Sequence, residues 1–311
     1  MSKKTSYLLG ILITIIIGTL LYCYLCDSCH CFPGQEASAP VENNNNVVEA
    51  PEVKQVTKNA FMISDANGDF NIETNDNFNF KTSNFSILEP ISEKITEGTL
   101  KLKDYLTNSS LKAVNITGYY RSDETNNSAY PNLGLARANS VKNYLVSQGI
   151  SSKQINTNGE LNDDINPDDE STLYGPLKFG VLTLKEGEKD EALEAACEDI
   201  RKNPLVLHFN TGQAQINLTT EQRQKIANIS NCVDHLGVKV QIVGHTDNTG
   251  NAENNVVLGQ NRADFAKTYL VSNGILESNI ETSSKGPYEP IADNNTEEGR
   301  KENRRTVITI N

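Results

Sequence analysis

The chain has 311 residues, which is enough for one large domain or two of ordinary size. Its 40 acidic residues outnumber its 28 lysines and arginines, and the resulting net charge of −12 argues against a nucleic-acid partner, because phosphate binding depends on Lys and Arg. Tryptophan is absent, but Val, Ile, Leu and Ala recur through two long stretches and predict packed cores.

An uncharged apolar run, residues 7–25, lies close to the start of the chain and follows two lysines. About twenty apolar residues span a bilayer, so we predict a transmembrane anchor with residues 1–6 in the cytoplasm and the bulk of the chain in the periplasm. A cleaved signal peptide is the first alternative, although its apolar region is usually about 7–15 residues long. A lipoprotein is the second, but bulky residues precede Cys23 and Cys26, so we favour the inner membrane over an outer-membrane lipoprotein.

Residues 26–58 follow the predicted anchor and contain prolines, glutamates and a run of asparagines. Such a segment buries too little apolar surface to order itself, so we predict a disordered tether. The cysteines at its start lack the second pair of ligands that a zinc site requires, so we expect no metal there. Local or interchain disulfides are the alternative for these cysteines, namely Cys23, Cys26, Cys29 and Cys31.

Two later blocks of the sequence repeat each other. Residues 137–150 read RANSVKNYLVSQGI, and residues 262–275 read RADFAKTYLVSNGI. Each block follows a strand-like segment that ends near a glycine, and each precedes another short strand. Alternating strands and helices indicate βαβ units. We therefore predict an α+β fold with two related βαβαβ-type domains, residues 59–185 and 190–311, each with helices packed on one face of a mixed sheet.

Cys197 and Cys232 lie on two predicted helices that flank the first strand of the second domain. An exported domain lies in a compartment that permits disulfides, so we predict that these cysteines are bonded. A bridge that closes a loop of this length stabilises a domain by about 3–4 kcal/mol in the chain-entropy treatment.

The polar segment GHTDNTG, residues 244–250, lies between a predicted strand and the helix that follows it. It presents Asp247 on a loop, while Asn255, Leu258 and Arg262 share one helix face at i, i+3 and i+7 spacing. A carboxylate and a guanidinium that face one hollow suit a zwitterionic ligand. The alternative is that Asp247 and Arg262 form an ion pair that only locks the loop to the helix.

Three motifs in this order resemble the OmpA-like peptidoglycan-binding domain of the OmpA, Pal and MotB type. They are GHTDNTG, N-x-x-L-x-x-x-R-A from Asn255, and N-T-x-x-G-R-x-x-N-R-R from Asn295, within residues 205–311. The resemblance implies that Asp247 and Arg262 hold the diaminopimelate of the peptidoglycan stem peptide. The other residues implied to line this site are Thr246, Asn255, Leu258, Arg304 and Asn210, the last at a position where the family usually has aspartate.

Residues 77–184 resemble the same domain, but their site is degenerate. Arg121 stands where the second copy has Asp247, although Arg137 is kept. A cation in that place would repel the ammonium group of the ligand, so we predict that the first copy does not bind it. Its expected role is spacing or contact with a protein partner.

No nucleophile with a base and an orienting acid is recognisable in the sequence, so we expect neither an enzyme nor a cofactor. The resemblance and the apolar run together predict a protein that tethers a membrane of a Gram-negative envelope to peptidoglycan. The alternative is a scaffold of an envelope machine, stator-like or secretion-related, in which wall binding is secondary. An ion-driven stator would need a membrane-embedded acid, and residues 7–25 contain none.

Overall fold

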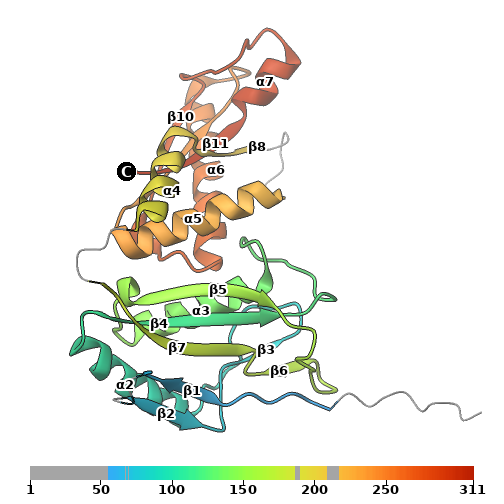
Figure 1. Cartoon of the computed structure of the whole chain (residues 1–311). Helices are drawn as coiled ribbons and strands as arrows, with labels where there is room; N and C mark the ends of the chain where they lie inside the picture. Colours follow the sequence, from blue (N-terminus) through green and yellow to red (C-terminus); the bar gives the residue numbers. More distant parts are fainter. Residues whose placement is uncertain (1–54, 67, 69, 186–189, 209–216) are drawn as a thin grey trace, which may run out of the picture. The chain divides into compact units, whose positions relative to one another are not determined.

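The computed structural model describes residues 55–311 except 67, 69, 186–189 and 209–216 (Figure 1). The predicted anchor, the four cysteines beside it and Asn210 lie outside the described residues. In the part of the chain that is described, no helix combines the length and apolar character needed to cross a membrane.

The main sheet of the first domain has the strand order β5-β4-β7. β5 pairs parallel with β4, whereas β7 pairs antiparallel with it. Parallel neighbours need a crossover, and helix α3 provides it (Figure 1). The bounds are α2 (Glu93–Thr107), β4 (Lys112–Tyr120), α3 (Leu133–Ser147), the 3-10 turn η1 (Ser152–Gln154), β5 (Ile155–Leu161) and β7 (Leu177–Thr183).

Two further pairs of short strands complete the first domain. β1 (Phe61–Ser64) pairs with β2 (Asn71–Thr74), and β3 (Asn79–Lys81) pairs with β6 (Thr172–Tyr174), both antiparallel. The β1-β2 hairpin joins the main core because the ring of Phe61 packs edge-on against Phe179 of β7, 4.9 Å between centroids. This aromatic contact secures an element that the βαβαβ prediction did not contain.

The sheet of the second domain has four strands in the order β10-β9-β11-β8. β9 is parallel to β10, and β11 is antiparallel to both β9 and β8. The bounds are α4 (Glu191–Lys202), β8 (Leu205–His208), α5 (Thr220–Leu236), β9 (Val240–His245), α6 (Ala252–Ser272), η2 (Glu277–Asn279), β10 (Ile280–Gly286), α7 (Glu297–Asn303) and β11 (Arg305–Ile310).

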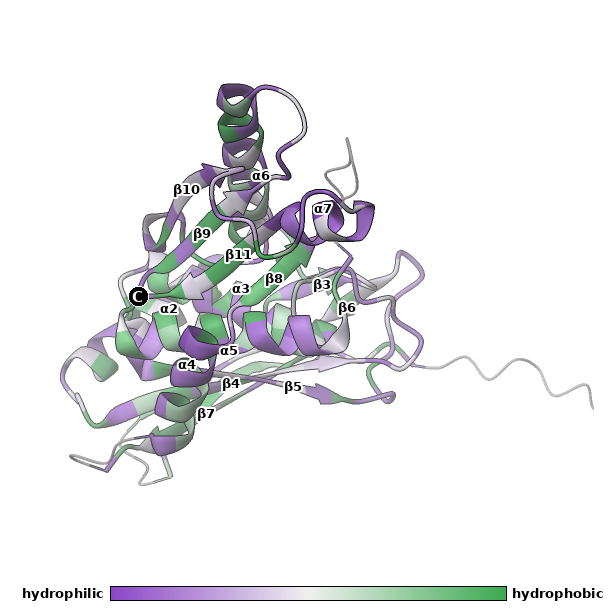
Figure 2. Ribbon diagram, turned by 90° about the horizontal axis from the view of Figure 1, so that it is seen from above, coloured by the Kyte–Doolittle hydropathy of each residue, from purple (hydrophilic) through white to green (hydrophobic). Residues whose placement is uncertain are grey.

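The helices of the second domain cover one face of its sheet. Along β9, Val240 and Ile242 are buried while Gln241 between them is exposed, as the two-residue period of a strand requires. The buried face joins a single core with residues of α4, α5 and α6, among them Ile229 and Ala266. Figure 2 shows β8 and β9 in hydrophobic colours and α7 in hydrophilic ones. The predicted α+β fold, with a mixed sheet and helices on one face, is confirmed here.

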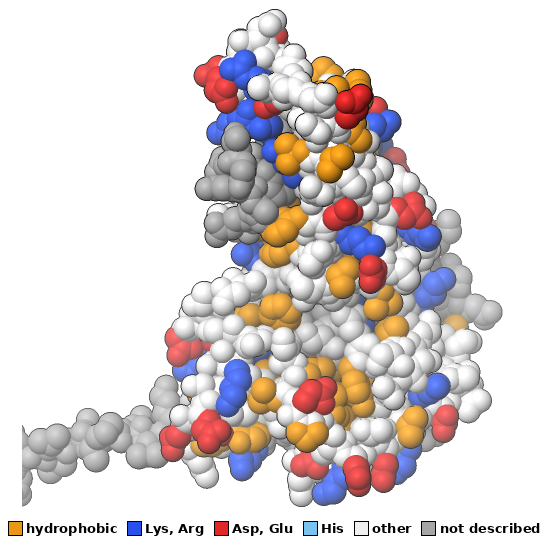
Figure 3. Space-filling model, turned by 180° about the vertical axis from the view of Figure 1, so that it is seen from behind, with side chains coloured by type: hydrophobic (Ala, Val, Ile, Leu, Met, Phe, Trp, Pro, Cys, Tyr) orange, Lys and Arg blue, Asp and Glu red, His pale blue; other side chains and the backbone are white. Residues whose placement is uncertain are grey.

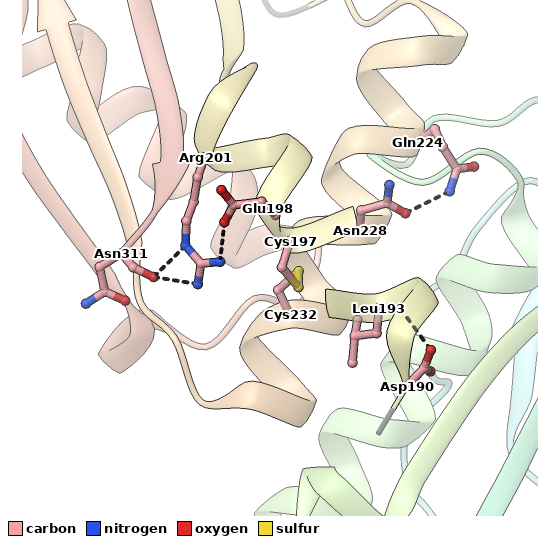
Figure 4. The surroundings of a disulfide bond; sticks show 9 residues. All are labelled: Asp190, Leu193, Cys197, Glu198, Arg201, Gln224, Asn228, Cys232 and Asn311. Atoms are coloured by element: carbon pink, nitrogen blue, oxygen red, sulfur yellow. Dashed lines mark hydrogen bonds and ion pairs between the residues drawn. A yellow bond between two sulfur atoms is a disulfide. The ribbon is translucent and has the colours of Figure 1, made fainter. Parts of the chain in front are cut away.

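The predicted disulfide is also confirmed. Cys197 of α4 and Cys232 of α5 are bonded and fully buried, with a sequence separation of 35 (Figure 4). Arg201, one turn beyond Cys197, donates to the backbone oxygen of Asn311 at 3.0 Å. The bridge therefore fixes α4 to α5, and this hydrogen bond connects α4 to the end of the chain.

A close approach of helix to strand occurs in both domains. A Cβ atom on Gly244 of β9 would lie 1.8 Å from the backbone oxygen of Gly259 in α6. In the first domain, a Cβ atom on Gly118 of β4 would lie 2.0 Å from the oxygen of Gly134 in α3. Since no side chain fits at such distances, glycine is required at each contact. Each helix is thereby pressed onto its strand one turn before a repeated arginine, Arg137 or Arg262.

The compact unit from residue 53 to 311 contains both domains, and polar contacts connect them. The ammonium group of Lys142 on α3 forms an ion pair with Asp234 on α5, and the Lys142 side chain is 2% exposed. The hydroxyl of Tyr130 lies 3.3 Å from that of Ser230. Because these contacts are buried, a domain separated from the other would expose them to water.

Candidate functional site

The loop after β9 holds Asp247 in one orientation. The N–H of Thr246 donates to the oxygen of Gly286 at 2.9 Å, which ties the loop to the end of β10. The Oδ1 atom of Asp247 accepts from the N–H of Thr249 at 3.0 Å. Gly250 then takes a positive φ of 90°, and the side chain of Asn251 caps α6.

Helix α6 brings three predicted site residues to this loop. The amide of Asn255 donates to the backbone oxygen of Thr249 at 3.0 Å. One turn later, Leu258 is 43% exposed although it is apolar. The Nη1 atom of Arg262 donates to the oxygen of His245 at 3.1 Å, so the guanidinium lies at the end of β9. The predicted helix face therefore does converge on the loop.

The segment around α7 supplies the other wall. Arg304 donates to the Oδ2 atom of Asp247 at 2.8 Å and to Glu297 at 3.1 Å. Arg300 donates to the other oxygen of Glu297 at 2.7 Å. Asn303, fully buried, accepts from the N–H groups of Ile291 and Ala292 and holds the preceding loop against α7. The structure thus pairs Asp247 with Arg304, a pairing that was not predicted from the sequence.

These side chains line a hollow of about 630 Å³. Six predicted site residues contribute to it, namely Thr246, Asp247, Asn255, Leu258, Arg262 and Arg304. Asn210, the seventh, lies outside the described residues. Three further residues of the lining were not predicted from the sequence, namely Thr249, Glu297 and Arg300. The charged run that precedes β11 was the signal that could have identified the last two.

Charge is concentrated in this hollow, and Figure 3 shows Lys and Arg beside Asp and Glu in the part of the second domain that carries α7. Burial opposes the charge of Asp247, but hydrogen bonds from Arg304 and the Thr249 N–H outweigh it and hold the pKa of this carboxyl below its usual range. Burial also lowers the pKa of Arg262, and the nearby Asp247 carboxylate acts in the opposite direction. Three guanidiniums and two carboxylates therefore face one small volume, an arrangement suited to a ligand that carries both signs of charge.

His245 directly precedes Thr246 of the hollow in sequence and is uncharged at neutral pH. Burial, together with the charge of Arg305, lowers its pKa to about 4. Its buried Nδ1 atom has no hydrogen-bond partner among the described residues. In the same part of the chain, no three His, Cys, Asp or Glu side chains are placed to hold a metal ion.

The first domain places Arg137 as the second places Arg262. The Nη1 atom of Arg137 donates to the oxygen of Tyr119 at 2.9 Å, which matches the contact of Arg262 with His245. Arg121, the predicted repelling cation, is bound by Asp123 through two hydrogen bonds of 2.8 Å. Both arginines of the degenerate copy are therefore engaged by neighbouring groups.

Comparisons with known proteins identify relatives of this chain. A stretch of 71 residues is 44% identical to the probable lipoprotein YiaD of Escherichia coli, covering 23% of this chain and 32% of that protein. A stretch of 120 residues is 35% identical to the peptidoglycan-binding protein ArfA of Mycobacterium tuberculosis, covering 38% and 36%. The chain spans less than half the length of either relative.

Among solved structures, the C-terminal domain of Helicobacter pylori MotB is 26% identical, with a TM-score of 0.30 over 35% of this chain and 84% of that one. The OmpA family profile matches two separate segments, residues 79–172 and 208–304, which together make up more than half of the chain. The two segments agree with the tandem arrangement predicted from the repeat. The chain belongs to the OmpA family.

Proposed function

We propose that this chain is a non-enzymatic protein of the cell envelope whose second domain binds peptidoglycan. Membership of the OmpA family supports the proposal, and the matched protein ArfA is named for peptidoglycan binding. The observation that carries it is the hollow in which Asp247, Arg262 and Arg304 meet at the end of β9. Such a site recognises charge without reacting with its ligand.

The proposed ligand group is the diaminopimelate of the stem peptide, because its free end carries one ammonium and one carboxylate. A guanidinium binds a carboxylate through paired hydrogen bonds, which is the role we assign to Arg262. Asp247 would accept from the ammonium. Its carboxylate has about four acceptor positions, and Arg304 and Thr249 account for two of them. The exposed Leu258 offers an apolar contact for the methylene chain of the ligand.

Anchoring belongs to the same proposal. Residues 7–25 would hold the chain in the inner membrane, and residues 26–58 would give the periplasmic domains reach to the wall. The first domain would then act as a spacer or contact a protein partner, with domain bounds near residues 59–185 and 190–311. A scaffold of an envelope machine remains the alternative to a simple tether, and both versions include wall binding by the second domain.

The direct test is binding of the full chain to isolated sacculi. Arg262→Met should weaken binding about tenfold to a hundredfold, because a charge-assisted hydrogen bond is worth about 1.5–3 kcal/mol. Arg201→Met is the matched control, since Arg201 lies on α4 and is not part of the hollow. Normal binding by a folded Arg262→Met protein would show that the site has been misassigned.

Competition identifies the ligand group. Free diaminopimelate should displace the chain from sacculi, whereas Nα-acetyl-lysine amide, whose free end carries an ammonium but no carboxylate, should not. Equal displacement by both compounds would contradict the assignment to the zwitterionic end, even if Arg262 proves necessary for wall binding.

A further inference from the structure

The guanidinium of Arg137 in the first domain is completely enclosed. Its side chain is 0% exposed, and its Nε atom donates to the backbone oxygen of Asn84 at 3.0 Å. A second donor, Nη1, reaches the oxygen of Tyr119, and the plane lies against the ring of Phe80 at 5.7 Å. An enclosed cation of this kind requires a negative partner, because an unpaired buried charge is costly.

That partner is the carboxylate of Glu124, whose side chain is 2% exposed. Arg137 binds it through two nitrogens, Nη2 to Oε1 and Nη1 to Oε2, the latter at 3.0 Å. The backbone N–H groups of Ser83 and Arg121 donate to the same two oxygens at 2.8 and 2.9 Å. A bidentate guanidinium and two N–H donors form a complete receptor for one carboxylate.

The path of the chain explains how Glu124 reaches this place. Helix α6 begins at Ala252, ten residues before Arg262, whereas α3 begins at Leu133, four residues before Arg137. Pro131 accounts for the late start, because a proline inside a helix lacks its N–H and clashes with the preceding turn. The residues that form the first turns of α6 in the second copy are therefore loop in the first.

This loop carries Glu124 over the arginine and is itself held by hydrogen bonds. The amide of Asn126 donates to the oxygen of Tyr130 at 2.8 Å, and the side chain of Asn132 caps α3. The hydroxyl of Ser83 accepts from the N–H of Thr125 at 3.0 Å, next to Glu124. Glu124 thus lies in an ordered, buried position and is a fixed part of the domain.

We propose that the first domain retains a carboxylate-binding site and that Glu124 fills it from within the chain. The ligand class of the site is a small carboxylate, held by the Arg137 guanidinium and the two backbone N–H groups. An internal ligand at this position keeps other carboxylates out, including those of the wall. The proposal concerns the first domain alone and does not depend on what the second domain binds.

Chemical rescue tests the proposal in the full chain. Glu124→Ala removes the internal carboxylate and should lower the thermal midpoint of unfolding, and added acetate should then occupy the vacated position. We expect acetate to raise the midpoint of this variant in a saturable manner, since a ligand that binds only the folded state stabilises it. Sodium chloride at the same ionic strength should have no comparable effect.

Two controls separate a specific site from a general effect of acetate. The unmodified chain gives the response of the second-domain hollow alone, because Glu124 already fills the site in the first domain. The double variant Glu124→Ala with Arg137→Met should show no more than this response, because the guanidinium is gone. Equal responses to acetate and chloride in Glu124→Ala would overturn the proposal. Failure of this variant to fold even in acetate would overturn it as well, because a site built for a carboxylate should accept the substitute.

Discussion

The two domains place the same arginine at the end of the same strand, yet its surroundings differ. Arg137 is sealed under a loop by Glu124, whereas Arg262 lines a hollow of about 630 Å³ together with Asp247 and Arg304. The glycine contacts that press helix onto strand are common to both copies. The comparison shows that the βαβ framework positions the guanidinium, while the segment between strand and helix decides what it can bind.

The largest expected difference between the domains is in stability. Arg137→Met leaves the carboxylate of Glu124 buried without its partner, and breaking a buried pair costs about 3–5 kcal/mol. Arg262→Met should lower the free energy of unfolding by less, because Arg262 faces the hollow. Urea unfolding of both full-length variants measures the two losses, and equal losses would show that the two arginines contribute equally to stability.

The disulfide should contribute nearly as much, and only to the second domain, since residues 59–185 contain no cysteine. Replacing both Cys197 and Cys232 by alanine should lower the free energy of unfolding by about 3–4 kcal/mol, mainly by freeing the unfolded chain. Thermal unfolding followed separately for each domain, for example by hydrogen exchange, measures how much stability each domain loses. A loss spread equally over both domains would mean that the bridge stabilises the whole unit.

A smaller effect is expected from the acid in the hollow. Asp247→Asn keeps the size of the side chain but removes its charge, so binding to sacculi should weaken about tenfold to a hundredfold. Asp123→Asn is the matched change in the first domain, where Asp123 binds Arg121, and it should leave binding unchanged. If both variants bind normally, the role of Asp247 is to hold Arg304 in place.

Between pH 7 and pH 5, binding to sacculi should change by less than about twofold. The pKa of the Asp247 carboxyl is held below its ordinary value of 3.8, so this group is charged at every pH above that value. Its contribution to binding is lost only as the pH falls through the lowered pKa. His245 stays neutral in this range because its pKa is about 4. A steep loss of binding near pH 6 would indicate another titrating group.

The smallest effect is expected from Arg121→Asp, which restores an acid to the first copy. Arg137 would remain sealed by Glu124, so this change should produce no new binding to sacculi when tested together with Arg262→Met. Recovery of binding would show that the charge at position 121, as the sequence analysis supposed, is the main obstacle.

Local patterns in the sequence were sufficient for the framework. The repeat from Arg137 and from Arg262 predicted two related α+β domains, in which strands alternate with helices. The spacing of Asn255, Leu258 and Arg262 placed them on one helix face, and the structure confirms that they line one hollow. These features depend on neighbours in sequence, so the sequence by itself determines them.

Contacts between distant segments were decided only by the tertiary structure. Asp247 pairs with Arg304, 57 residues away, and Phe61 joins the core through Phe179, so no local pattern reveals either contact. Glu124 belongs to a loop that composition describes merely as polar, yet its burial against Arg137 closes the first site. Which charge meets which depends on how the chain packs, because the free energy of an ion pair is set by distance and burial rather than by position in sequence.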